Sequence, residues 1–90
     1  MSRLNIEVEG TPNPSAAKFV LEQGTLGEES RSYFSAADAE GDPLAKRLFG
    51  IQGVRALLMV DNFITVTRAE DTAWDEIVEE VLCVIREELE

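Results

Sequence analysis

The chain has 90 residues, of which 44% are hydrophobic, and this composition is typical of a globular protein and not of a disordered one. Its 18 acidic and 8 basic side chains give a net charge of −10 at pH 7, which argues against nucleic-acid binding because phosphate contacts need a basic surface. We expect residues 1–90 to form one domain.

The first ten residues, MSRLNIEVEG, alternate apolar and polar side chains and do not resemble a signal peptide. No apolar run approaches the ~20 residues that span a bilayer. The single cysteine, Cys83, is typical of a reducing compartment and excludes an intramolecular disulfide. We therefore expect a soluble cytoplasmic protein that does not contact membranes.

Two strands are predicted near the N-terminus. Apolar residues occupy alternate positions over 3–9 and again over 17–22, which is the period of a half-buried strand. The segment between them, TPNPS at 11–15, contains two prolines that cannot join a sheet ladder, so it is a stiff loop. We expect the two strands to pair as a hairpin across this loop.

The next segment leads into a short helix. Residues 23–29 contain two glycines and are turn-like, and residues 32–35 are expected to form a short strand. Asp42 is a suitable N-cap and Pro43 fits the first helical position. Gly50 is expected to end this helix in a left-handed turn.

Residues 53–68 are rich in β-branched residues, and Asp61–Asn62 predict a tight two-residue turn between two strands. The better core face of this hairpin carries six side chains: Leu57, Met59, Ile64 and Val66, followed by Arg55 and Arg68. The opposite face carries three apolar side chains: Leu58, Val60 and Phe63. These three are either a half-exposed patch of the kind that marks an interface, or they are covered by the loop at 23–41.

A final helix is predicted over residues 72–89, with Thr72 as its cap. One apolar stripe at helical spacing packs it on the sheet: Trp74, Ile77, Val78, Val81, Ile85 and Leu89. Residues 70–90 hold nine acidic side chains and one basic side chain, a net charge of −8. This acidic surface is either a solvated helix face or a dock for a basic partner.

The sequence gives little chemical support for a catalytic or metal-binding role of the lone cysteine. On the helical wheel Cys83 lies ~180° from Trp74, among the carboxylates of Glu79, Glu80 and Glu87. Because carboxylates oppose the thiolate, we expect an inert surface thiol, and Cys83 is only a weak candidate metal ligand. The sequence contains no histidine, no phosphate-binding glycine loop and no evident nucleophile with an activating base, so we expect no enzyme activity and no catalytic residues.

Three blocks in fixed order carry a resemblance to a known family: TPNPSAAKF (11–19), DPLAKRLFGIQGV (42–54) and FITVTR (63–68). The sequence resembles the Nfu-type N-terminal domain, which precedes the NifU-like domain of iron–sulfur cluster scaffold proteins and also occurs as a free-standing small protein. The resemblance implies an α+β fold, with a small antiparallel β-sheet of about four to five strands and two helices packed mainly on one face.

The resemblance also implies a link to iron–sulfur cluster assembly. In two-domain relatives a CxxC pair in the second domain holds the cluster. This sequence has one cysteine and no CxxC pair, so the resemblance implies a stand-alone N-terminal domain with no resident cofactor. The family supplies no catalytic residues to assign.

We therefore expect a non-catalytic, monomeric interaction domain that docks an iron–sulfur scaffold, carrier or client protein. The candidate contact residues lie in the proline loop, among the basic side chains and on the hairpin: Thr11, Asn13, Ser15, Lys18, Lys46, Arg47, Arg55, Phe63 and Arg68. Each base is alternatively an ordinary solvated side chain, and Asn13 alternatively closes its loop by a hydrogen bond. Two other functions stay open: an iron or cluster carrier formed by Cys83 thiolates of two chains, and a regulatory module unrelated to iron.

Overall fold

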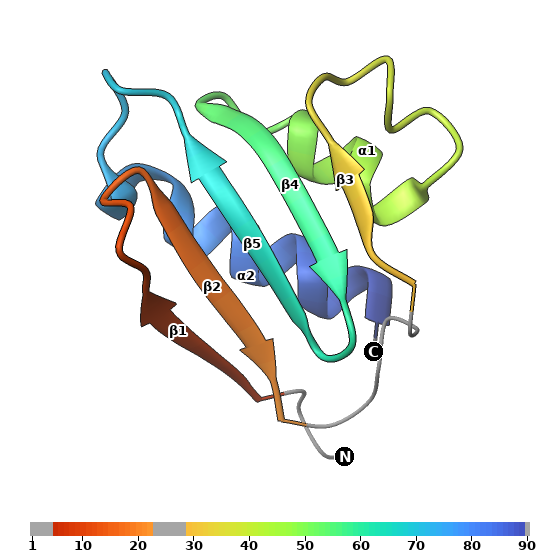
Figure 1. Cartoon of the computed structure of the whole chain (residues 1–90), viewed down its shortest axis with the longest axis horizontal. Helices are drawn as coiled ribbons and strands as arrows, with labels where there is room; N and C mark the ends of the chain where they lie inside the picture. Colours follow the sequence, from red (N-terminus) through yellow and green to blue (C-terminus); the bar gives the residue numbers. More distant parts are fainter. Residues whose placement is uncertain (1–4, 23–28, 90) are drawn as a thin grey trace.

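The computed structural model describes residues 5–22 and 29–89, which form one antiparallel sheet and two helices (Figure 1). The strands are β1 (Ile6–Gly10), β2 (Ala16–Leu21), β3 (Arg31–Tyr33), β4 (Val54–Val60) and β5 (Phe63–Arg68), and their order across the sheet is β1-β2-β5-β4-β3. The helices α1 (Pro43–Phe49) and α2 (Trp74–Leu89) lie behind the same face of this sheet (Figure 1). The predicted α+β class is confirmed.

Both predicted hairpins are present. β1 pairs antiparallel with β2 across the proline loop, with Glu7 opposite Val20. In the second hairpin Val60 lies opposite Phe63, which confirms the two-residue turn. Asp61 has a φ of 52°, in the left-handed region that aspartate tolerates better than most residues.

The core lies between the sheet and the two helices. It contains the inward side chains of the three central strands, and these include Phe19, Leu21, Leu57, Met59, Ile64 and Val66. The helices contribute Leu44, Ala45 and Leu48 from α1 and Ile77, Val81, Val84 and Ile85 from α2. All four apolar residues that alternation placed on the core face of the second hairpin are buried. The three on its opposite face, Leu58, Val60 and Phe63, are half-buried.

The start of α1 agrees with the sequence, but its end does not. Asp42 Oδ1 accepts hydrogen bonds from the backbone N–H groups of Leu44 and Ala45, at 3.1 and 3.2 Å, as expected of an N-cap. Gly50 has a φ of −71° and is not left-handed. Between α1 and β4 the residue with a left-handed φ is Gly53, at 106°.

Gly53 is required for two reasons. A Cβ there would lie 2.6 Å from Cγ2 of Thr72, and the positive φ itself disfavours any side chain. Thr72 therefore packs against Gly53 and does not directly precede α2, so the expected Thr72 cap is wrong. Ala73 directly precedes the helix, and its N–H donates to the Glu76 carboxylate at 3.3 Å.

Three further details differ from the sequence-based expectation. Strand β3 covers Arg31–Tyr33, whereas residues 32–35 were expected to form it, and Phe34 is 74% exposed. On α2, Val84 is buried although it lies outside the predicted stripe, while Leu89 is 41% exposed. The expected turn at 23–29 and the covering loop at 23–41 lie partly outside the described residues.

The pairing of β4 with β5 shifts by one residue at its start. Val54 pairs with Arg68 but Ala56 pairs with Thr67, so Arg55 is the extra residue of a β-bulge. The bulge turns Val54 into the core and leaves Arg55 exposed. The expectation that Arg55 continues the core face is therefore wrong. Within residues 5–22 and 29–89 no helix combines the length and apolarity needed to cross a membrane.

Candidate functional site

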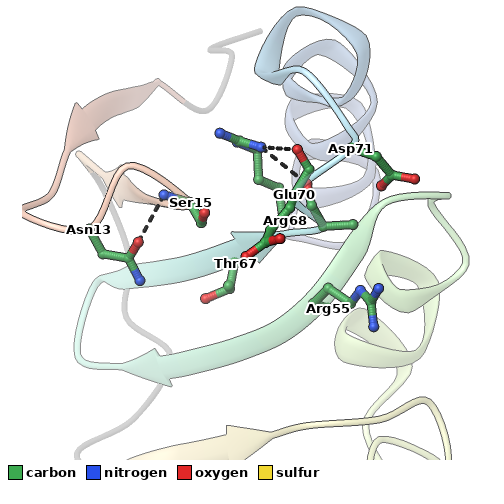
Figure 2. A pocket seen from close by; sticks show the side chains of 8 residues that line it. Asn13, Ser15, Arg55, Thr67, Arg68, Glu70 and Asp71 are labelled. Carbon is green, nitrogen blue, oxygen red and sulfur yellow. Dashed lines mark hydrogen bonds between the residues drawn. The ribbon is translucent and has the colours of Figure 1, made fainter.

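A polar pocket of about 670 Å³ lies at the end of the sheet opposite the β4–β5 turn (Figure 2). We call it the sheet-end pocket, and its lining residues are Asn13, Ser15, Arg55, Thr67, Arg68, Ala69, Glu70 and Asp71. They come from the proline loop, the start of β4, the end of β5 and the segment that leads to α2. Four of the predicted contact residues, Asn13, Ser15, Arg55 and Arg68, are thus brought together here.

The proline loop presents a fixed polar edge to this pocket. Asn13 Oδ1 accepts a hydrogen bond from the Ser15 N–H at 2.9 Å, which is the loop-closing bond considered as the alternative for Asn13 (Figure 2). Thr11 Oγ1 donates to the Asn13 carbonyl at 2.8 Å and accepts from the Asn13 N–H at 3.2 Å. These local bonds hold the loop in one shape, so Thr11 shapes the loop but does not line the pocket.

Arg68 secures the segment between β5 and α2. Its Nη1 lies 3.1, 3.3 and 2.9 Å from the carbonyl oxygens of Ala69, Glu70 and Thr72. The guanidinium also lies 5.9 Å from the ring centre of Trp74. Among the described residues, its Nε is buried and has no hydrogen-bond partner. Arg68 therefore forms part of the pocket wall, and its Nη1 is used within the fold.

Arg55 is the basic group of the pocket that solvent reaches most freely. The bulge exposes its side chain, and Figure 2 shows its guanidinium turned to a different side from that of Arg68. Glu70 and Asp71 are exposed and also line the pocket. The pocket thus offers one accessible guanidinium, hydroxyl and amide groups, and two carboxylates, a set that suits hydrogen bonding to a polar protein surface.

Two other predicted contact residues meet on the face of the sheet that the helices leave uncovered. Lys18 Nζ lies 4.1 Å from the centre of the Phe63 ring, a cation–π contact across β2 and β5. Both residues are half-buried. They lie on a different surface from the sheet-end pocket and do not contribute to it.

The last two predicted contact residues are on α1 and pair with acids of the same chain. Lys46 Nζ lies 3.8 Å from Glu40, with both groups well exposed. Arg47 forms ion pairs with Glu87 and Glu88 and so joins α1 to the end of α2. The hydrogen bonds that Arg47 donates to Glu87 and then to Glu88 raise the pKa of Arg47, and the bond to Arg47 lowers the pKa of Glu87. Arg47 therefore links the two helices by ion pairs.

Cys83 is exposed on α2, and its thiol donates to Glu87 Oε2 at 3.4 Å. This hydrogen bond, followed by the negative charge of Glu87, raises the pKa of the Cys83 thiol. The protonated form is thereby favoured, and it is a poor nucleophile and a poor metal ligand. In the described part of the chain, no three His, Cys, Asp or Glu side chains are grouped closely enough to hold a metal ion.

Sequence reasoning missed three polar residues of the pocket, Thr67, Glu70 and Asp71. Thr67 and Glu70 flank the Arg68–Ala69 pair at the end of a predicted strand, and that position was the available signal. Nothing in the sequence indicated that the proline loop lies beside them.

The comparisons with known proteins agree with this architecture. The family described as the scaffold protein Nfu/NifU N-terminal domain matches residues 6–90. The chain belongs to this family. The predicted resemblance is therefore confirmed over nearly the whole sequence.

The curated relatives of this Nfu/NifU N-terminal domain are longer proteins. It is 41% identical over 81 residues to the mitochondrial NFU1 iron–sulfur cluster scaffold homolog of Drosophila ananassae, a match that covers 89% of this chain but 28% of the fly protein. It is 31% identical over 80 residues to the mitochondrial NifU-like protein 4 of Arabidopsis thaliana, again 89% of this chain and 28% of the relative.

Solved structures share the fold of this Nfu/NifU N-terminal domain. A NifU-like protein of Saccharomyces cerevisiae matches with a TM-score of 0.84 at 24% identity, over 97% of this chain and 79% of the yeast chain. The crystal structure of protein SAV1430 of Staphylococcus aureus matches with a TM-score of 0.77 at 24% identity, over 93% of this chain and 99% of the other. At this level of identity the likeness concerns the fold alone.

The expected cytoplasmic location is wrong in the light of these relatives, because the fly and plant proteins are mitochondrial. The expectation was based on a lone cysteine and an alternating N-terminal segment. A lone cysteine indicates a reducing environment but does not distinguish one reducing compartment from another.

Proposed function

We propose that this chain is a non-catalytic interaction domain of iron–sulfur cluster assembly, and that the sheet-end pocket is its contact surface for a protein partner. The observation that carries the proposal is the family match over residues 6–90, since the curated relatives are named iron–sulfur cluster scaffolds. The cluster itself is the cargo of the assembly and is held by other chains or domains.

The composition of the chain supports a contact role over a carrier role. Protein-bound iron–sulfur clusters use about four ligands, most of them cysteine thiolates, whereas this chain has one cysteine and no histidine. Two chains that join their Cys83 thiolates would supply only half of such a set. The raised pKa of the Cys83 thiol further disfavours the thiolate that this alternative requires.

The geometry of the pocket supports Arg55 as its principal contact residue. Its guanidinium is exposed by the bulge and carries five N–H donors, which suit recognition of a carboxylate or of backbone carbonyls. Arg68 is engaged with the carbonyls of its own loop, and Arg47 with α2. Replacing Arg55 therefore removes contact chemistry while leaving these supporting interactions in place.

Affinity capture under anaerobic conditions, followed by mass spectrometry, tests this proposal. We expect the wild-type chain to retain iron–sulfur scaffold, carrier or client proteins, and the Arg55→Glu variant to lose most of them. Lys46→Glu makes the same change of charge on α1, outside the pocket, and should leave the captured set unchanged.

Two results would contradict the proposal. Reproducible partners without any iron–sulfur protein among them would remove the assembly role and favour a regulatory module unrelated to iron. Loss of partners with Lys46→Glu but not with Arg55→Glu would move the contact surface from the sheet-end pocket to α1.

A further inference from the structure

Within residues 5–22 and 29–89, the outer edge of β1 presents backbone groups without a partner strand in a regular pattern. β1 is the last strand on its side of the described sheet and pairs with β2 alone (Figure 1). The Glu22 N–H donates to the Asn5 carbonyl at 3.0 Å, so Asn5 and Glu22 form a hydrogen-bonded pair of the antiparallel ladder. Because such pairs alternate with non-bonded ones, Ile6, Val8 and Gly10 direct their N–H and C=O groups away from β2.

An apolar pocket of about 250 Å³ lies beside this edge on the helix side of the sheet. Val8, Gly10 and Pro14 line it from the strand and its loop, and Trp74 and Val78 line it from α2. Val8 is 43% exposed, and a Cβ placed on Gly10 would meet no atom within 4 Å. The Trp74 indole N–H donates to the Pro14 carbonyl at 3.2 Å, which fixes the ring as one wall.

The other face of the same strand is acidic. Glu7 and Glu9 alternate with Ile6, Val8 and Gly10, so their side chains project from the sheet face that carries no helix. Both are exposed. A strand added to β1 would therefore place successive side chains alternately beside an apolar pocket and beside a carboxylate.

We infer that the β1 edge binds an extended protein segment in which basic and apolar side chains alternate. The segment adds a sixth strand to the sheet by hydrogen bonds to Ile6, Val8 and Gly10. Its apolar side chains enter the pocket beside Val8 and Trp74, and its lysine or arginine side chains face Glu7 and Glu9.

The charges of β1 disfavour a second copy of this chain as the occupant. In an antiparallel β1–β1 pair centred on Val8, Glu7 of each chain would lie opposite Glu9 of the other. Like charges directly opposite each other destabilise a strand pair. A basic segment converts the same two positions into favourable cross-strand pairs.

This inference does not rest on the role in iron–sulfur cluster assembly, because Arg55 does not line the apolar pocket, which shares Asn13 with the sheet-end pocket. It is tested with the full chain and a short capped peptide in which lysine alternates with leucine and valine. A peptide of the same composition, with the lysines and the apolar residues in two separate blocks, is the matched control.

Trp74 is the only tryptophan and lines the pocket, so its fluorescence reports occupancy. We expect the alternating peptide to change this fluorescence and to slow hydrogen exchange at the amides of Ile6, Val8 and Gly10. We expect the block peptide to bind at least about tenfold more weakly, because it cannot satisfy both faces at once. Arg55→Glu should leave both titrations unchanged, which separates this site from the proposed function.

Two variants locate the site. Val8→Pro removes an outward N–H without removing a β1–β2 hydrogen bond, and prolines are tolerated on edge strands, so the fold should persist while the affinity falls about tenfold. Replacing Glu7 and Glu9 together by lysine should weaken binding about fivefold or more. The same double replacement at Glu79 and Glu80, exposed acids on α2, controls for net charge and should have a smaller effect.

The inference is overturned by any of four results. These are absence of binding up to about 1 mM peptide, equal affinity for the block peptide, equal weakening by the two pairs of lysine replacements, and exchange protection outside β1. If the first of these results is found together with a dimer of the chain that protects β1, the edge serves self-association instead.

Discussion

The two faces of the sheet are built from the same strands but differ in how deeply their side chains are buried. On the helix-covered face the side chains of β2, β4 and β5 are buried against α1 and α2, and this packing holds the fold. On the uncovered face their neighbours in sequence are half-buried and include Leu58, Val60 and Phe63. The comparison teaches that strand alternation places the residues that stabilise the fold on one face and half-buried residues on the other, so neighbouring positions in one strand differ in how much they contribute to stability.

The largest effect is expected from a pair of adjacent leucines in β4. Leu57→Ala, at a buried position, should lower the free energy of unfolding by about 3 kcal/mol through lost burial and a cavity. Leu58→Ala, on the uncovered face, should lower it by about 1 kcal/mol. Urea unfolding monitored by Trp74 fluorescence measures both, and equal losses would break the comparison.

A smaller loss of stability is expected at Gly53, where the segment before α2 packs against the residue that precedes β4. Gly53→Ala places a Cβ against Thr72 and forces an alanine into a positive φ, so unfolding should become easier by about 2 kcal/mol. Gly41→Ala meets no atom within 4 Å and should change stability by no more than about 0.5 kcal/mol. Thermal unfolding of the two variants tests whether the Gly53–Thr72 contact contributes to stability as the buried face of the sheet does. A similar response from both would mean that it does not.

The cap of α1 should contribute less again. Asp42→Ala removes the acceptor of two helical N–H groups and of contacts from Arg31 and Tyr33, and should lower stability by about 1–2 kcal/mol. Asp38→Ala, which removes one exposed bond to the Phe34 N–H, should have a smaller effect. Urea unfolding of both variants decides whether the cap or the exposed loop bond contributes more.

The ionisation of the only tyrosine, Tyr33, reports on this cap in a pH titration. Burial, followed by the hydrogen bond to Asp42, raises the pKa of Tyr33 above its ordinary value of 10.0. Its contribution to stability is therefore complete below pH 10 and is lost as the pH rises through the folded-state pKa. An ultraviolet titration should show the phenol of Asp42→Ala ionising at lower pH than that of the wild type. An unchanged titration would mean that the hydrogen bond to Asp42 does not raise the pKa of Tyr33.

The smallest effect concerns the solvent side of α2. Glu87→Gln should lower the pKa of the Cys83 thiol toward its ordinary value and speed its alkylation at neutral pH about twofold to fivefold. Glu88→Gln removes the other acidic partner of Arg47 and should leave the alkylation rate unchanged. Equal acceleration in both variants would mean that general charge, and not the Cys83–Glu87 bond, controls the thiol.

The sequence predicted the fold well where one local rule acts alone. Alternation identified the buried residues of β4 and β5, and the Asp42–Pro43 pair identified the start of α1. It failed where two segments constrain each other. Among the described glycines the left-handed one is Gly53, where Thr72 also leaves no room for a side chain, and this contact between distant residues is invisible to local rules.

The candidate site was harder to predict for the same reason. Strict alternation directs Arg55 toward the core, and only the bulge opposite Arg68 exposes it. The proline loop, the bulge and the β5–α2 segment meet only after the sheet has assembled in the order β1-β2-β5-β4-β3. Charge alone predicts contact roles for Lys18, Lys46 and Arg47, and the structure places them on other surfaces.

Anaerobic reconstitution of the purified chain with iron and sulfide tests the central claim most directly, because the claim is that this chain makes contacts and does not itself hold a cluster. We predict that the wild type and the Cys83→Ser variant give the same spectrum, with no charge-transfer absorption that stays with the protein after desalting. A stable band in the wild type that Cys83→Ser abolishes would contradict the account and establish the paired-cysteine carrier in its place.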